Sequence, residues 1–142
     1  MVRVEMQRRT GDFGFEAKDA AGHVIHLDSS SDTGGMDSGI RPMQGLLMSL
    51  GACSAIDIIS ILKKQKQTIN NFKIIIEGER EQGKLPSLWK KINVQFQLAG
   101  NIDLEKATKA CTLSIEKYCS VAETLRRAGA EINWEVEVVE KQ

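Results

Sequence analysis

Residues 42–64 read PMQGLLMSLGACSAIDIISILKK, and this stretch decides what kind of fold the chain can form. Pro42 stands where a helix begins, a position at which the missing N–H of proline is no loss. Lys63, Lys64 and Lys66 stand in the last turns, where positive charge complements the helix dipole. The residues between are apolar on nearly every face, which predicts a long central helix covered on most sides. One chain of 142 residues has difficulty covering such a helix alone, and this favours a dimer.

The segments on either side of this helix have the patterns of strands, turns and shorter helices. Residues 1–28 predict a meander of short strands, and residues 28–40 predict a polar, glycine-rich loop. The order predicts a single α+β domain spanning residues 1–142. The remaining expected elements are a strand pair at 72–79 and 91–98, a helix at 103–118, a short helix at 120–129 and a last strand at 132–138.

Composition and charge exclude several classes of partner. Lys plus Arg and Asp plus Glu both number 19, so the formal net charge is zero and the concentrated positive surface that nucleic acid requires is not expected. The apolar stretch is only at the lower limit for a membrane span and contains Asp57, so no membrane is expected. The N-terminus lacks the apolar run of a secretory signal. Three cysteines, an odd number, then indicate a reducing, cytoplasmic compartment.

Two of the three cysteines, Cys53 and Cys119, are candidates for reactive thiols. Cys53 lies in the middle of the long helix, one turn before Asp57, although an isolated helix cysteine is also compatible with a buried small hydrophobe. Cys119 lies between two helices, directly before a capping-box pattern at 120–123. The positive end of that helix is expected to lower the pKa of its thiol, and a packed, inert thiol is the alternative. Cys111 shares a stripe with small residues and is predicted to be core.

Other candidate sites are weak. His23 and His26 are three residues apart on a predicted strand, so they point to opposite faces and suit metal ligation poorly. No glycine-rich segment has the spacing of a phosphate-binding loop.

Two separated segments resemble the OsmC/Ohr family. Residues 41–64, with Cys53 near their centre, resemble its first-cysteine helix. Residues 114–121, SIEKYCSV, are similar to the second-cysteine segment of the OsmC-like branch. The order of strands and helices agrees over nearly the whole chain. The resemblance implies an OsmC-like fold in an intertwined homodimer, with antiparallel sheets wrapped around the long central helices.

The resemblance also implies an activity, which is the thiol-dependent reduction of organic or lipid hydroperoxides. In that scheme Cys53 is the peroxidatic thiol, which attacks the hydroperoxide and becomes a sulfenic acid. Cys119 is the resolving thiol, which condenses with the sulfenic acid to a disulfide, and an external dithiol restores both thiols. No metal and no organic cofactor are needed.

The sequence departs from the family pattern at one point. The well-studied peroxidases of the family activate the first cysteine with an arginine, held by a glutamate that follows the motif proline. Met43 and Gln44 stand at those positions here, and Gln44 cannot form an ion pair. Arg41 is the predicted substitute cation, with Arg8 or Arg9 as alternatives and a solvated surface arginine as the plainer interpretation of each. Two other functions therefore stay open: a weakly catalytic redox-sensing or apolar-ligand-binding dimer, and a structural protein with inert cysteines.

Overall fold

The computed structural model of the protein describes residues 1–139. The chain divides into two compact units, Met1–Leu46 and Leu47–Gln142, and each contains a three-stranded sheet. The long helix α1 (Pro42–Lys64) begins in the first unit and continues into the second, and it starts at the predicted proline. The predicted α+β class is thus confirmed, whereas the expectation of one domain over residues 1–142 stays a prediction.

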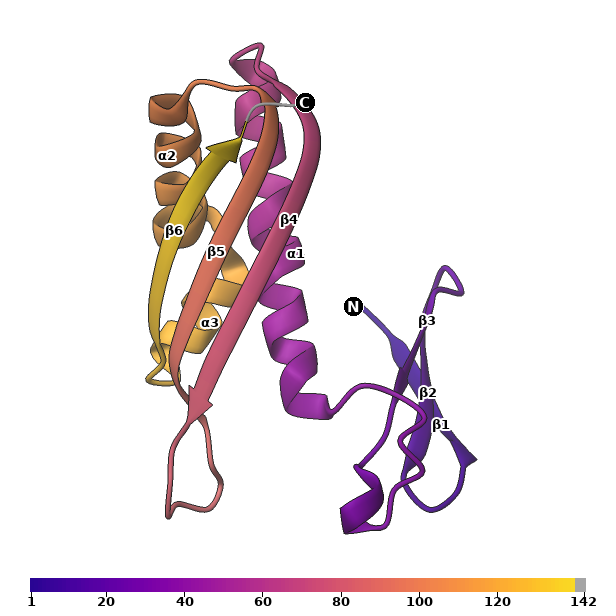
Figure 1. Ribbon diagram of the computed structural model, residues 1–142. Helices are drawn as coiled ribbons and strands as arrows, with labels where there is room; N and C mark the ends of the chain where they lie inside the picture. Colours follow the sequence, from indigo (N-terminus) through magenta and orange to yellow (C-terminus); the bar gives the residue numbers. More distant parts are fainter. Residues whose placement is uncertain (140–142) are drawn as a thin grey trace. The chain divides into compact units, whose positions relative to one another are not determined.

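The first unit holds the predicted meander. Strands β1 (Val4–Thr10), β2 (Gly14–Asp19) and β3 (Val24–Leu27) pair antiparallel in that order (Figure 1). The turns between them contain Gly11 and Gly22 at φ values of 58° and 90°. Residues with a Cβ rarely adopt this left-handed conformation, which explains why glycine stands at both turns.

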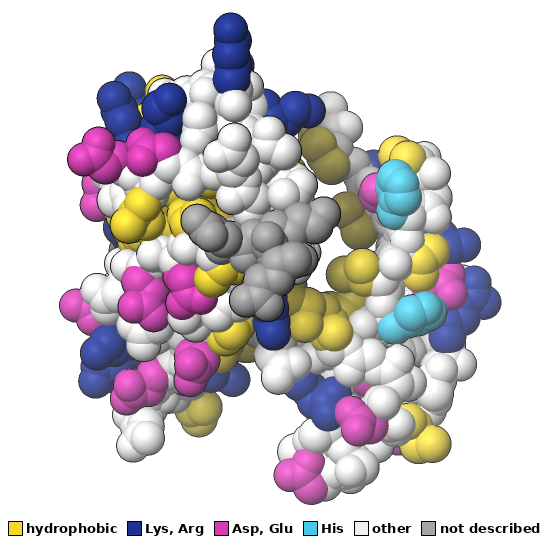
Figure 2. Space-filling view, turned by 45° about the horizontal axis from the view of Figure 1, so that its top comes forward, with side chains coloured by type: hydrophobic (Ala, Val, Ile, Leu, Met, Phe, Trp, Pro, Cys, Tyr) yellow, Lys and Arg dark blue, Asp and Glu magenta, His cyan; other side chains and the backbone are white. Residues whose placement is uncertain are grey.

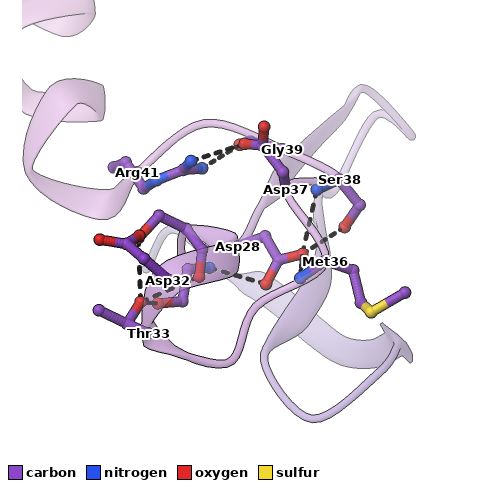
Figure 3. Close-up of polar contacts among 10 residues, drawn as sticks. Asp28, Asp32, Thr33, Met36, Asp37, Ser38, Gly39 and Arg41 are labelled. Carbon is purple, nitrogen blue, oxygen red and sulfur yellow. Dashed lines mark hydrogen bonds and ion pairs between the residues drawn. The ribbon is translucent and has the colours of Figure 1, made fainter.

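The loop between β3 and α1 is folded around one carboxylate (Figure 3). Asp28, only 2% exposed, accepts hydrogen bonds from the Ser29 amide (2.7 Å), the Met36 amide (3.1 Å), and both the amide (3.1 Å) and hydroxyl (2.7 Å) of Ser38. A short 3-10 turn, η1 (Ser31–Thr33), lies within it. These bonds, that of the Ser38 hydroxyl first, hold the pKa of Asp28 below its ordinary value. The predicted loop therefore has a fixed polar centre.

The second unit contains a sheet of longer strands. β4 (Thr68–Arg80), β5 (Trp89–Asn101) and β6 (Glu131–Val139) lie side by side in that order, and β4 and β5 extend beyond their predicted ranges. β4 and β5 are antiparallel, but β6 runs parallel to β5, which corrects the expectation of purely antiparallel sheets. The reason is the connection: helices between β5 and β6 return the chain to the end of the sheet where β5 began.

Helices cover one face of this sheet and form the core with it. Figure 1 shows α2 (Leu104–Leu113), α3 (Ser120–Arg127) and the second-unit part of α1 on the same side of the strands. A π-helical turn, η2 (Ser114–Tyr118), joins α2 to the segment before α3. The inward side chains of β5 alternate as predicted and are at most 2% exposed, namely Ile92, Val94, Phe96 and Leu98. They pack with Leu50, Ile58, Leu62 and the core cysteine Cys111, as expected for that cysteine.

Only part of α1 is buried within one chain. Met48, Ile56 and Ile59 are 52%, 66% and 37% exposed, so a single chain leaves part of this helix uncovered, which agrees with the expected difficulty of covering it alone. By length and composition α1 could cross a membrane, since its most apolar window has a mean hydropathy of 1.9 and is 28% buried. Core helices meet the same criteria, and the other side of α1 packs into the core of the second unit. The exposed apolar side of α1 is a hydrophobic patch of the kind that commonly marks an interaction surface.

Charged side chains of both signs are interspersed over the face seen in Figure 2. Together with the zero net charge, this distribution gives no concentrated basic surface among the described residues on that face. Phosphate backbones bind best where positive charge is concentrated.

Candidate functional site

The second unit brings together the two cysteines that the sequence singled out. The Sγ atoms of Cys53 and Cys119 and a carboxylate oxygen of Asp57 all lie within 4.8 Å of one another. Cys119 lies 65 residues after Ser54, the residue next to Cys53, so the pairing of the two cysteines is a product of the fold and not of local sequence. Both thiols are free in this structure.

Helix α1 positions two of these three groups. Cys53 and Asp57 are four residues apart, so their side chains lie on one face of the helix, one above the other. Both are partly buried, and each therefore keeps some access to solvent. The sequence spacing alone predicts that this thiol and this carboxylate are neighbours.

The third group, Cys119, is held at the start of α3. Its backbone is extended (φ −75°, ψ 105°) and its Sγ accepts a hydrogen bond from the amide of Ala122 at 3.4 Å. Cys119 is therefore the N-cap itself, and the predicted capping box is wrong. Ser120 is already the first helical residue, and Glu123 forms ion pairs with two arginines of the same helix instead of returning to the cap. The sulfur fixes where α3 begins.

Burial determines the acidity of Cys119. The residue is 2% exposed, and loss of solvation raises the pKa of its thiol. The Ser54 hydroxyl and the Ala122 amide oppose this shift, while the neighbouring Cys53 adds to it. The expectation of a lowered pKa is thus wrong, because one helix terminus does not offset the desolvation of a nearly enclosed sulfur.

Two fully buried serines connect the thiol to the carboxylate. The Ser54 hydroxyl lies 2.7 Å from the Leu50 carbonyl and 3.5 Å from the Sγ of Cys119. The Ser114 hydroxyl lies 3.1 Å from the Ser54 carbonyl and 3.1 Å from Oδ2 of Asp57. Each hydroxyl has one proton to donate, so each can serve either partner. The arrangement allows the hydrogen bonds to change direction when a proton or charge moves.

Arg41 and Gln44, the predicted supporting residues, belong to the first unit. The guanidinium of Arg41 donates to Oδ1 of Asp37 at 2.6 Å and to the Gly39 carbonyl at 3.0 Å (Figure 3). Gln44 is exposed in the first turns of α1. Arg41 is thus held by an aspartate of its own loop, and its role as the cation that activates Cys53 stays a prediction.

Sequence reasoning assigned no role to Asp57, Ser54 or Ser114. The four-residue spacing of Cys53 and Asp57 was the available signal for the carboxylate. Nothing local could identify the serines, because their partners lie about sixty residues away: Ser54 with Cys119, and Ser114 with Asp57.

Comparison with known proteins shows the family to which the chain belongs. A model of the OsmC-like protein family matches residues 35–135, which is most of the chain and includes both site cysteines. The chain belongs to the OsmC-like family. Protein YhfA of Escherichia coli strain K12 is 40% identical to it over 116 residues, covering 80% of this chain and 82% of YhfA.

Solved structures of OsmC-like and related proteins have the same fold. A hypothetical protein from Aquifex aeolicus VF5 superposes with a TM-score of 0.85 at 29% identity, over 100% of this chain and 98% of its own. An organic hydroperoxide resistance protein OsmC from Legionella pneumophila superposes with a TM-score of 0.69 at 14% identity, over 97% of this chain and 96% of its own. The second likeness concerns the fold alone.

Proposed function

We propose that this OsmC-like protein reduces organic hydroperoxides with the thiols of Cys53 and Cys119. The observation that carries the proposal is the approach of the two sulfur atoms to within 4.8 Å of each other. A disulfide bond of about 2.05 Å needs only a modest further approach of the side chains. The same fold in an organic hydroperoxide resistance protein supports the choice of substrate class.

The difference in exposure supports the proposed order of the two thiols. Cys53 is partly exposed, whereas Cys119 is 2% exposed, so the peroxide meets Cys53 first. The Cys53 thiolate attacks the terminal peroxide oxygen, an S–O bond forms and the O–O bond breaks. The alkoxide leaves as an alcohol after taking up a proton, and Cys53 becomes a sulfenic acid.

The second step requires a proton acceptor next to Cys119. Burial raises the pKa of this thiol, so the sulfur is protonated before it attacks the sulfenic acid of Cys53. We assign the acceptor role to Asp57, whose carboxylate lies within 4.8 Å of both sulfurs. The proton passes from Cys119 to Asp57 and then to the departing hydroxide, giving water and a Cys53–Cys119 disulfide. An external dithiol then reduces the disulfide by exchange, which suits a cytoplasmic protein.

The working unit is proposed to be a homodimer. Met48, Ile56 and Ile59 give the second-unit part of α1 an apolar side that one chain leaves open, and a second copy offers an identical apolar side to cover it. Light scattering tests this directly: the native protein should have the mass of two chains, and Ile56→Glu should shift it to one. A native mass of one chain rules out the homodimer.

Treatment of the reduced protein with one equivalent of cumene hydroperoxide tests the activity. Intact-mass analysis should show rapid loss of two hydrogens, and peptide mapping should locate a Cys53–Cys119 bridge. Cys53→Ser should stay unmodified, whereas Cys119→Ser should stop at the sulfenic acid of Cys53. Serine is itself a favoured N-cap residue, so this second variant keeps the start of α3. Cys111→Ala, which changes a core cysteine outside the Cys53–Asp57–Cys119 cluster, is the matched control and should behave as native.

Two results would contradict the proposal. Thiols that stay reduced in the native protein after minutes of exposure exclude a peroxidase. A disulfide that forms once but gives no catalytic turnover with excess dithiol favours the redox-sensing or ligand-binding dimer. The exposed Gln44, which stands in place of the family glutamate, would then explain the lack of turnover.

A further inference from the structure

We propose that the reduced protein binds one zinc-type divalent cation per chain through Cys53, Asp57 and Cys119. This inference goes beyond peroxide reduction and does not depend on it, because it concerns the affinity of the thiol form for a metal ion. The ligand atoms are the two Sγ atoms and one carboxylate oxygen of Asp57.

The geometry of the three groups is close to that of a metal site. Their ligand atoms lie within 4.8 Å of one another. With Zn–S near 2.3 Å and Zn–O near 2.0 Å, tetrahedral zinc holds such atoms about 3.5 to 3.8 Å apart. Small side-chain rotations close the difference, and Cys53 and Asp57 have room for them because both are only partly buried. Cys119 is the fixed point of the set, since its sulfur caps α3.

Hydrogen-bond donors already face two of the three ligands. The Ala122 amide donates to the Sγ of Cys119 at 3.4 Å, and the Ser54 hydroxyl lies 3.5 Å from the same sulfur. The Ser114 hydroxyl lies 3.1 Å from Oδ2 of Asp57. Metal ligands are commonly held in this way by a surrounding layer of donors, which orients them and stabilises their anionic forms.

The charge of the site favours a cation. Within residues 1–139, no Lys, Arg or His side chain forms an ion pair with Asp57. A carboxylate and two ionisable thiols are therefore gathered without a positive partner from the described part of the chain. A divalent ion supplies the missing charge and lets both thiols ionise together.

The donor types select the class of metal. Thiolates favour zinc and other borderline or soft ions, while magnesium and calcium prefer all-oxygen sites. Three protein ligands leave a fourth position for water, as in zinc sites that keep one coordination position open. Binding is not a redox step: each ion displaces two thiol protons as two S–metal bonds form. When an organic hydroperoxide oxidises the pair to a disulfide and is itself reduced to an alcohol and water, both thiolates are lost and the ion is released.

Cobalt titration of the reduced full-length protein, without oxygen, tests the site. Thiolate ligation should produce a thiolate-to-cobalt charge-transfer band and tetrahedral visible bands that saturate at one ion per chain. Cobalt binding should release about two protons per ion, and added zinc should displace the cobalt and bleach both sets of bands. Cys53→Ser should abolish the bands, Asp57→Asn should weaken binding at least about tenfold, and Ser114→Ala should weaken it about tenfold. Cys111→Ala should match the native protein.

The outcomes separate this inference from the proposed peroxidase. Absence of a charge-transfer band in the native protein overturns the metal site whatever the peroxide assay gives. A band that Asp57→Asn leaves unchanged in position and affinity overturns the role of the carboxylate and with it the three-ligand site. Circular dichroism of each variant confirms that a lost band is not a lost fold.

Discussion

Each of the two units contains an aspartate within a polar cluster, and the two clusters are built in opposite ways. Asp28 accepts four hydrogen bonds, which lower the pKa of its carboxyl group and connect the parts of a loop. Within the described part of the chain, Asp57 accepts one hydrogen bond, from Ser114, and otherwise lies beside two thiols. A carboxylate whose acceptor positions are filled holds structure, whereas one with open positions next to a nucleophile can take up a proton or a cation.

The strongest test of this contrast is Asp57→Asn, which keeps the shape and removes the charge. If Asp57 accepts the proton of Cys119, the disulfide-forming step should slow about a hundredfold. The sulfenic acid of Cys53 should accumulate and be trapped by dimedone, as stopped-flow and mass spectrometry can measure. The residual rate should rise with pH, since the Cys119 thiol, whose pKa is raised, then ionises unaided. If Asp57→Asn forms the disulfide at the native rate at every pH, Asp57 does not act as the proton acceptor.

A smaller effect is expected from Arg41→Gln. A cation beside a thiol lowers its pKa by one or more units, so loss of the proposed activating charge should reduce the rate of the first step about tenfold at neutral pH. Peroxide consumption under single-turnover conditions measures this step. Arg8→Gln is the matched control, and a loss of rate there with none at Arg41 transfers the role to the first strand.

Asp28→Asn should affect stability and leave the thiols unchanged. The four hydrogen-bond donors around Asp28 share two carboxylate oxygens, whereas an asparagine offers them only one. The thermal midpoint of the first unit, which contains this loop, should therefore fall by several degrees. The folded pKa of Asp28 lies below its ordinary 3.8, so its contribution is present above that pH and is lost as the pH falls through the folded value. The variant should therefore lose part of the acid dependence of native stability, as melting curves at several pH values measure. An equal effect on peroxide consumption contradicts the division of roles between the two aspartates.

The smallest effect is expected at Ser120, the residue that the capping-box pattern placed at the N-cap. Because the sulfur of Cys119 occupies that position, Ser120→Ala should change the free energy of unfolding by less than about 0.5 kcal/mol. Loss of a true N-cap typically costs about 1 kcal/mol, so chemical denaturation can separate the two cases.

The sequence predicted those features that depend on local periodicity. The alternation in β5 identified its buried face, and Pro42 marked the start of α1 correctly, whereas the helix ends at Lys64, before the Lys66 that was expected in its last turns. Features that depend on distant parts of the chain were missed or inverted. The parallel pairing of β6 follows from the helical connection after β5, and the raised pKa of Cys119 follows from packing that no local pattern reports.

The candidate site was also predicted only in part. Cys53 and Cys119 were identified as a pair through family resemblance, and the fold brings them together. Asp57 could have been included from its helical spacing to Cys53. The two serines could not, because a buried hydroxyl has no signature in sequence until its partners are known.

The sulfur cap of α3 has one more consequence. The sulfur of Cys119 accepts the hydrogen bond of the Ala122 amide at 3.4 Å, and a disulfide of about 2.05 Å with Cys53 requires the two sulfurs to approach further, which strains this contact. Oxidation of Cys119 therefore weakens the first turn of a helix whose outer side faces solvent. The helix start then frays more often, and amide hydrogen exchange at its first residues quickens. The stability of the first turn of α3, a helix at the surface, thus reports the oxidation state of the buried sulfur of Cys119.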